Sequence, residues 1–167
     1  MMIGNLLAAA AMEEGLNVTY LPVYGPEMRG GTANCTVVVS EEDIGSPIIH
    51  RPTSLIIMNR PSLDKFQPRL QNKGKQVLNS SLIDSELAEK DRVRTFCIEA
   101  NAIADRLGNT RMANMVALGA YIKSTGVLPI SRVQSSLDQV IPSHRAKLIP
   151  KNREAIQAGA DEVIEIN

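Results

Sequence analysis

The sequence predicts an α/β fold with a largely parallel sheet and a helical C-terminal third. Short runs rich in β-branched residues alternate with helical patterns through the first two thirds of the chain, which is the element order of parallel sheets. The run Leu55–Met58 is apolar at every position, as in a strand that is covered on both faces. Beyond about residue 100, apolar residues recur at helical spacing. With 167 residues, 44% of them apolar, the chain has room for one domain with a sizeable core.

The first part of the chain predicts one helix and a series of strands. The segment Ile3–Glu14 is rich in Ala, Leu and Met and is followed by Gly15, which is typical of a helix with a glycine stop. Pro61 fits the first turn of a second, short helix. Strands are expected at Asn17–Leu21, Thr32–Val39 and Ser54–Met58, and weaker patterns predict strands at Gln76–Asn79 and Val93–Ile98.

The C-terminal third predicts a series of helices. Ser131 and Gln134 have the spacing of a capping box, and the apolar stripe of that helix consists of Val133, Leu137 and Val140. The other helices are expected at Asn101–Leu107 before Gly108, at Thr110–Ser124 before Gly126, and from Pro150 to Ala158 with a stop at Gly159. In the second of these, the small residues Ala113, Ala117 and Ala120 allow another element to approach closely.

Charge and composition exclude several function classes. Eighteen Lys and Arg residues balance eighteen Asp and Glu residues, so a general electrostatic grip on nucleic acid or on an anionic membrane is not expected. The longest uninterrupted apolar stretch, Leu6–Met12, is far shorter than the roughly 20 residues that span a bilayer. Only five residues are aromatic, which argues against a stacking platform for single-stranded nucleic acid.

The two cysteines indicate free thiols. Cys35 and Cys97 lie far apart in the chain, with no CxxC motif, so they cannot by themselves hold an iron–sulfur cluster or a structural zinc. Both lie in apolar, strand-like segments, which predicts buried thiols and a protein of the reducing cytoplasm.

Two loops carry candidate functional residues. The first two strands are joined by Tyr24-Gly25-Pro26-Glu27-Met28-Arg29-Gly30-Gly31. One interpretation is an ordinary strand connection with Glu27 and Arg29 in solvent. The other is a loop that presents Arg29 to an anion or to a carboxylate of a partner, with glycine N–H groups exposed beside it. Asn59 and Arg60 follow the apolar strand at the sheet edge where doubly wound folds bind ligands.

The twelve residues from Tyr24 to Cys35 resemble the γ subunit of 2-oxoacid:ferredoxin oxidoreductases, and the related domain inside single-chain pyruvate:ferredoxin oxidoreductases. This block is far more specific than a lone glycine motif. The resemblance covers nearly the whole chain. It continues through Ile44–Pro47, Asn59–Ser62, Leu107–Asn109, Asn114–Ala120, Asn152–Ile156 and Gly159.

The resemblance implies a three-layer, Rossmann-like γ domain that spans residues 1–167. It implies a complex that converts a 2-oxoacid and coenzyme A to acyl-CoA and carbon dioxide and passes two electrons to ferredoxin. This chain then holds no catalytic residue, metal or cofactor. Thiamine diphosphate and Mg²⁺ lie between the α and β subunits, and iron–sulfur clusters lie on β or on a ferredoxin-like δ subunit. The interface or coenzyme-A-proximal loop comprises Tyr24, Gly25, Pro26, Glu27, Met28, Arg29, Gly30, Gly31, Thr32 and Asn34.

The sequence departs from the family pattern at its start. Family members usually begin with a strand and a glycine-rich turn of the GxGGQG kind, and Met1–Asn5 resembles the residues just after that turn. We therefore expect the first strand and the turn to be missing, through a truncated gene prediction or a shortened chain. The loop sequence GPEMRGGTAN is more similar to the 2-oxoglutarate and branched-chain types than to the pyruvate type.

Two alternative functions stay open. One is a non-catalytic assembly protein without ligand contact, and the other is a free-standing nucleotide- or coenzyme-A-binding domain. Genes for α and β subunits beside this one would favour the γ subunit or the assembly protein over the free-standing domain. Because the net charge is zero and the apolar helices between Thr110 and Ile141 are expected to bury faces against partners, the isolated chain is predicted to self-associate.

Overall fold

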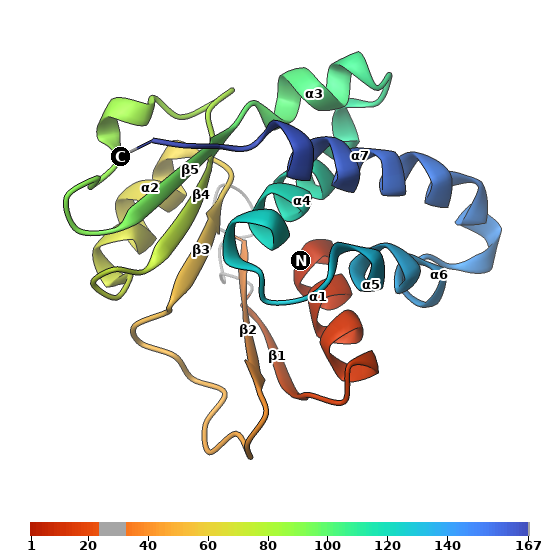
Figure 1. The fold of residues 1–167 in the computed structure, drawn as a ribbon, viewed down its shortest axis with the longest axis horizontal. Coiled ribbons are helices and arrows are strands. Elements are labelled where there is room, and N and C mark those ends of the chain that lie inside the picture. The colour runs from red at the N-terminus through yellow and green to blue at the C-terminus, as the bar shows by residue number, and fades with distance from the viewer. Residues whose placement is uncertain (24–32, 167) are drawn as a thin grey trace.

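The computed structural model describes residues 1–23 and 33–166. The elements follow one another from an N-terminal helix through strands to a helical C-terminal region (Figure 1). The helices and strands are α1 (Met2–Glu13), β1 (Asn17–Val23), β2 (Asn34–Ser40), β3 (Ser54–Ile57), α2 (Arg60–Phe66), β4 (Lys75–Asn79), β5 (Arg94–Ile98), α3 (Ala100–Arg106), α4 (Ala113–Thr125), α5 (Ile130–Ser135), α6 (Leu137–Val140), α7 (Ile149–Glu162) and β6 (Ile164–Glu165). Short 3₁₀ helices cover Gln67–Arg69, Ser85–Leu87, Thr110–Met112 and Ser143–Leu148.

The main sheet has the strand order β3-β4-β5-β6. The first three strands are parallel, with Ile56 opposite Val77 and Val77 opposite Phe96. The short β6 pairs antiparallel with β5 at the edge. The predicted α/β class, the mostly parallel sheet and the helical C-terminal third are therefore confirmed, whereas β6 was not anticipated because two residues carry no strand pattern.

Helices cover both faces of this sheet, which makes three layers (Figure 1). Successive residues of β3 alternate between the two sides. Ile56 and Met58 join the larger core under α4, and Leu55 and Ile57 join the smaller core under α2. The same alternation places Phe96 in the larger core and Cys97 in the smaller one. The fully apolar strand predicted from the sequence is thus covered on both faces, as expected.

The first two strands form a separate antiparallel sheet, with a register that runs from Asn17–Ser40 to Val23–Asn34. Sequence alternation did not reveal this separation, because strand pairing is decided by contacts between distant residues. The strand expected to end at Leu21 continues through Pro22 to Val23. Proline is tolerated there because β1 pairs with one strand only among the described residues, so a missing N–H can face away from the ladder.

Helices α4 and α7 cross with backbone against backbone. A Cβ added at Gly119 would lie 1.8 Å from the Ile156 carbonyl oxygen, and one added at Gly159 would lie 1.9 Å from that of Val116. Another element therefore does approach the second C-terminal helix closely, as predicted, but the contact that shows it is at Gly119 and not at Ala113, Ala117 or Ala120, the residues to which the sequence analysis assigned it. The predicted helix stop at Gly159 is wrong: α7 runs on to Glu162, and Gly159 serves the crossing instead.

Two predicted helix starts also differ. Ser131 is inside α5, whose N-cap is Pro129, so the capping box is wrong. The backbone at Pro129 is extended, and the helix begins at Ile130, two residues earlier than the capping box predicts. The helix expected from Thr110 begins with a 3₁₀ turn capped by Asn109, and α4 starts at Ala113. The predicted glycine stop is confirmed at Gly126, which adopts the left-handed conformation after α4.

Candidate functional site

The strands that flank the loop singled out by the sequence are β1 and β2. Val23 and Asn34 are the last paired residues there. Asn34 is partly buried and begins β2. The other predicted loop residues lie outside the described residues: Tyr24, Gly25, Pro26, Glu27, Met28, Arg29, Gly30, Gly31 and Thr32. The structure therefore places the base of the predicted loop, and the role of the loop stays a prediction.

The base of the loop packs against the start of α1. A Cβ at Gly4 would lie 2.5 Å from Cys35 Sγ and 3.1 Å from the Tyr20 ring. The Tyr20 hydroxyl donates a hydrogen bond to the Met1 carbonyl oxygen (3.3 Å). Glycine at position 4 thus allows the first turn of α1 to lie directly on the strands that carry the loop.

Both cysteines are free thiols, as predicted. Cys97 is buried, and burial raises the pKa of its thiol. Cys35 is only partly buried, which is less than the sequence led us to expect; it lies in β2, a strand of the two-stranded sheet that packs against α1. The two residues belong to different sheets. Within residues 1–23 and 33–166, no three His, Cys, Asp or Glu side chains come together as a metal site.

Asn59 and Arg60 lie at the carboxyl end of β3, as the sequence predicted. The Asn59 side chain accepts a hydrogen bond from the Ser62 backbone N–H (3.0 Å) and so caps α2. Arg60 Nε donates to Asp64 Oδ1 at 2.7 Å on the exposed side of the same helix. Both side chains therefore have local structural partners, and a ligand-binding role for them stays a prediction.

A buried amide at the same sheet edge was not identified from the sequence. Asn79 ends β4 and is only 1% exposed. Its Nδ2 donates to Asn101 Oδ1 (2.7 Å) and to the Met58 carbonyl oxygen (3.3 Å), while its Oδ1 accepts from the Ala100 N–H (3.1 Å). Asn79 thus ties the ends of β3 and β4 to the start of α3. The sequence feature that could have identified Asn79 is its position directly after the apolar pair Val77-Leu78, at the end of a predicted strand.

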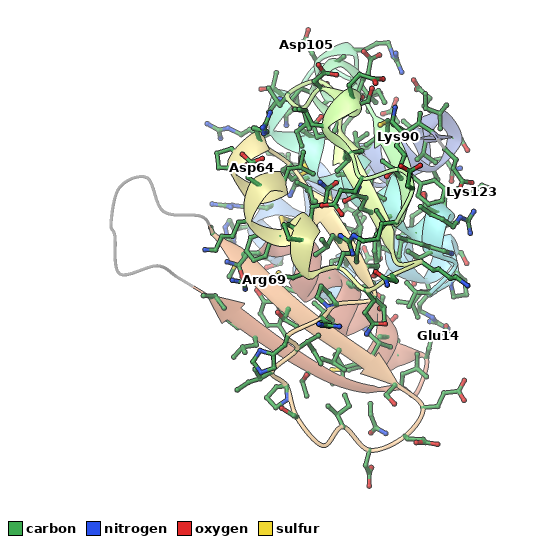
Figure 2. All side chains as sticks on the ribbon, turned by 90° about the vertical axis from the view of Figure 1, so that its left-hand side faces the viewer. Glu14, Asp64, Arg69, Lys90, Asp105 and Lys123 are labelled. Atoms are coloured by element: carbon green, nitrogen blue, oxygen red, sulfur yellow. The ribbon has the colours of Figure 1, made fainter. Side chains whose placement is uncertain are left out.

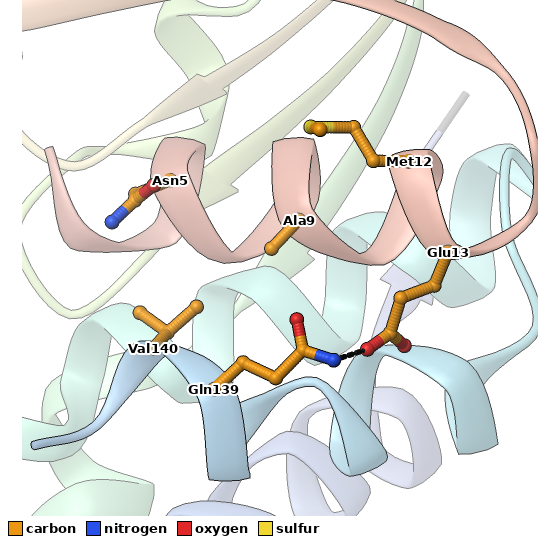
Figure 3. A pocket seen from close by; sticks show the side chains of 6 residues that line it. All are labelled: Asn5, Ala9, Met12, Glu13, Gln139 and Val140. Carbon is orange, nitrogen blue, oxygen red and sulfur yellow. Dashed lines mark hydrogen bonds between the residues drawn. The ribbon is translucent and has the colours of Figure 1, made fainter.

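A shallow hollow of about 520 Å³ lies between α1 and α6 (Figure 3). It is lined by Asn5, Ala9, Met12, Glu13, Gln139 and Val140. The carboxylate of Glu13 is hydrogen-bonded by side chains of the α5–α6 segment. It accepts hydrogen bonds from Gln139 Nε2, from Ser136 Oγ at 2.8 Å and from Arg132 Nη1 at 3.5 Å. Arg132 also pairs with Glu14, and this hydrogen bond raises the pKa of the guanidinium.

Acidic and basic side chains both occur on the side of the molecule seen in Figure 2, where Asp64 of α2 and Arg69 of the 3₁₀ helix that follows it are labelled. The helices from Thr110 onward bury their apolar residues inside the chain. Met115, Val116, Leu118 and Leu137 are all fully buried. Most apolar residues of these helices are therefore covered within the chain by α1, α3, α7 and the sheet, whereas Val140 lines an open hollow beside α1. Self-association of the isolated chain stays a prediction. In the described part of the chain, none of the helices is both long and apolar enough to cross a membrane.

Comparison with protein families and curated proteins gives a consistent result. The family model described as pyruvate ferredoxin/flavodoxin oxidoreductase matches residues 1–162. Ketoisovalerate oxidoreductase subunit VorA of Methanothermobacter marburgensis is 35% identical over 161 residues, which is 95% of this chain and 33% of VorA. The 2-oxoglutarate synthase subunit KorC of the same organism is 30% identical, over 94% of this chain and 86% of KorC. The chain thus spans about a third of the length of VorA and most of the length of KorC.

Solved structures show the same fold. The γ subunit of a keto/oxoacid ferredoxin oxidoreductase from Geobacter sulfurreducens has a TM-score of 0.83 at 23% identity, covering 96% of this chain and 87% of that one. The 2-oxoglutarate:ferredoxin oxidoreductase from Magnetococcus marinus, solved with 2-oxoglutarate, coenzyme A and succinyl-CoA bound, also has a TM-score of 0.83, at 20% identity, covering 99% of this chain and 29% of that one.

Proposed function

Because the chain belongs to the pyruvate ferredoxin/flavodoxin oxidoreductase family, we propose that it is the γ subunit of a 2-oxoacid:ferredoxin oxidoreductase. The observation that carries this proposal is the match to KorC, a separate subunit that aligns with this chain over most of both lengths. The proposed complex consists of this chain, residues 1–167 forming one γ-type domain, with α and β subunits and a ferredoxin-like δ subunit. It acts in the cytoplasm.

The proposed reaction joins a 2-oxoacid and coenzyme A, releases carbon dioxide and passes two electrons to ferredoxin. Within residues 1–23 and 33–166, the cysteines do not fit an iron–sulfur cluster, and no group of three or more His, Cys, Asp or Glu side chains is placed to hold a metal ion. Cys35 and Cys97 lie on different sheets, and the described carboxylates and histidines do not converge. We therefore assign thiamine diphosphate, Mg²⁺ and the iron–sulfur clusters to the partner subunits, and we assign no bond-making step to this chain.

The proposed substrate is 2-oxoglutarate or 2-oxoisovalerate. The relatives named for ketoisovalerate and 2-oxoglutarate are 35% and 30% identical to this chain, whereas a common γ subunit of pyruvate and ketoisovalerate oxidoreductases from Thermococcus litoralis is 24% identical. The loop sequence GPEMRGGTAN supports the same choice.

We assign to the loop between β1 and β2 the closure of the active-site region and the admission of coenzyme A. Arg29 is the residue that we expect to act there, because a guanidinium presents a rigid fork to a phosphate or a carboxylate and lysine cannot reproduce it. The base of the loop supports this assignment, since Val23 and Asn34 hold it on a sheet that packs against α1.

The test is Arg29→Lys in the assembled complex, with Arg145→Lys, an exposed arginine on another segment, as the matched control. A charge-assisted contact is worth about 1.5–3 kcal/mol, which corresponds to about a 10- to 150-fold effect. A KM for coenzyme A raised by that factor identifies an anionic group of coenzyme A as the target. Weakened assembly with an unchanged KM identifies a carboxylate of a partner subunit and favours the assembly role.

Wild-type behaviour of Arg29→Lys in both assays would reduce the loop to an ordinary strand connection. Failure of the wild-type chain to co-purify with α and β subunits would contradict the γ-subunit assignment itself and favour a free-standing binding domain. Steady-state kinetics and size-exclusion chromatography of the reconstituted complex separate these outcomes.

A further inference from the structure

Positively charged residues gather at the edge of the four-stranded sheet where its parallel strands begin. Lys75 begins β4 and Arg94 begins β5, and the two residues are opposite each other in the ladder. Lys75 Nζ donates a hydrogen bond to the Ser124 carbonyl oxygen at the end of α4 (2.9 Å). The Arg94 guanidinium donates to both carboxylate oxygens of Glu165 (2.7 and 2.9 Å). These two cations are therefore already compensated within the chain.

Three further cations at this edge are not compensated in the same way. Arg51, Arg69 and Lys73 are exposed, and none of them forms an ion pair within residues 1–23 and 33–166. Gln71 joins the two segments that carry them. Its backbone N–H donates to the Pro52 carbonyl oxygen and its Nε2 donates to the Arg51 carbonyl oxygen, both at 3.0 Å. We call Arg51, Arg69 and Lys73 the amino-edge patch.

Acidic residues of the segment that leads into β5 offset only part of this charge. Glu86 and Glu89 are paired with Lys90 and Arg92 of the same segment. Asp91, which is exposed, forms no ion pair in the described part of the chain. The amino-edge patch is thus a local surplus of positive charge in a chain whose formal net charge is zero.

Lys73 keeps its side chain at a cost to the backbone. Its φ of 63° is in the left-handed region, and among the described residues other than glycine it alone has a positive φ. Glycine adopts this conformation freely, whereas a residue with a Cβ is strained there. Hydrogen bonds fix the turn, since the Lys73 N–H donates to the Arg92 carbonyl oxygen and the Gly74 N–H to that of Gln71, both at 2.9 Å. A strained lysine at a position that glycine fits better indicates that the side chain itself is used.

The make-up of this surface fits a protein that binds and leaves. Permanent subunit interfaces are large and apolar, whereas electron-transfer encounters are small and are steered by charge. Here three exposed cations accompany a small apolar area, because Ile48 and Ile49, which precede Arg51 in the chain, are 60% and 40% exposed. A nucleic acid fits less well, since the net charge is zero and only five residues are aromatic. The surface is therefore complementary to an acidic face of a transient protein partner.

In the proposed reaction, one protein has to bind and leave during turnover, namely the acceptor of the two electrons. We propose that the amino-edge patch docks an acidic surface of this electron-accepting protein. This inference rests on the proposed function, because it requires a reaction that delivers electrons to a protein. The patch steers and holds the acceptor, and the electrons leave from the clusters that we assign to the partner subunits.

The experiment measures the reduction of ferredoxin by the assembled complex at low and at high salt. Arg51→Glu reverses one charge of the amino-edge patch. Lys73→Gly removes another charge and relieves the backbone strain, so a folding defect does not explain its effect. Lys147→Glu is the matched control, because Lys147 is an exposed lysine on the 3₁₀ helix before α7 and forms no ion pair within the described residues. Reduction of methyl viologen, a small acceptor that needs no protein docking surface, reports on the rest of the reaction.

We expect Arg51→Glu and Lys73→Gly to raise the KM for ferredoxin by about three- to tenfold at low salt, and this difference from the wild type to shrink at about 1 M salt, where charges are screened. Reduction of methyl viologen should stay unchanged, and Lys147→Glu should leave the KM for ferredoxin within about twofold.

An unchanged KM for ferredoxin in both variants, or a raised KM that salt does not affect, overturns the inference while the γ-subunit assignment stands. Equal losses with ferredoxin and methyl viologen also overturn it, because the patch then serves the assembly of the complex. If the wild-type complex reduces no ferredoxin at all, the proposed function fails and the inference fails with it.

Discussion

Replacing Gly119 by alanine tests the packing on which the C-terminal half of the fold depends. The new Cβ would lie 1.8 Å from the Ile156 carbonyl oxygen and 2.7 Å from its carbon. Because carbon and oxygen normally approach no closer than about 3.3 Å, α4 and α7 would have to separate locally by about 1.5 Å. The obstructing atoms are backbone atoms of a helix, so no side-chain rotation relieves the contact.

The expected cost follows from two opposing effects. Overpacking a close-packed core costs about 1–3 kcal/mol and sometimes more, and the residues around the crossing, Val116 and Ile156, are fully buried. Alanine regains about 1 kcal/mol of helix propensity over glycine. A backbone clash falls at the upper end of the overpacking range, so we expect the free energy of unfolding to fall by about 2 kcal/mol or more. In a chain of this length that lowers Tm by about 4–8 °C.

Urea denaturation followed by circular dichroism measures this change. Gly45→Ala is the matched control, because a Cβ there meets no atom within 4 Å and the backbone is not in the left-handed region. We expect the control to stay within about 0.5 kcal/mol of the wild type. A Gly119→Ala chain as stable as the wild type would show that the two helices do not touch through their backbones, and the argument for the crossing would be refuted.

Two further predictions concern buried groups. Asn79→Ala leaves the Ala100 N–H and the Asn101 side-chain amide without their buried partner. We therefore expect the free energy of unfolding to fall by about 1–3 kcal/mol. An unchanged midpoint of urea denaturation would contradict the stabilising role of Asn79. Burial raises the pKa of the Cys97 thiol, so the unfolded chain releases this proton at a lower pH than the folded chain. Stability from this group is therefore present below the unfolded value of about 8.5 and is lost as the pH rises above it. In the Cys97→Ala variant, Tm should therefore decline less steeply between about pH 8.5 and 10 than in the wild type. Equal slopes of Tm against pH in the variant and the wild type would exclude a contribution of the Cys97 thiol.

Local patterns in the sequence were sufficient for the class of fold and for the family. The alternation of strands and helices predicted the parallel sheet, and the continuous apolar run Leu55–Met58 predicted a strand with cores on both faces. The order of elements and the apolar run are both properties of residues that are adjacent in the chain. A strand that is buried on two faces needs apolar residues at every position, so the run Leu55–Met58 indicates such a strand directly. The family followed from the block between Tyr24 and Cys35, a long and specific run of residues, and the family model confirms it.

The tertiary structure decided which elements meet. Gly126 and Gly159 carry the same local signal, yet Gly126 ends a helix and Gly159 lies within one, because only Gly159 faces the backbone of another helix. The separate pairing of β1 with β2 and the buried amide of Asn79 likewise arise from contacts between residues far apart in the chain. Periodicity shows that one side of a segment is apolar. The partner that buries that side is set by the free energy of packing distant segments together, and this energy belongs to the folded chain as a whole.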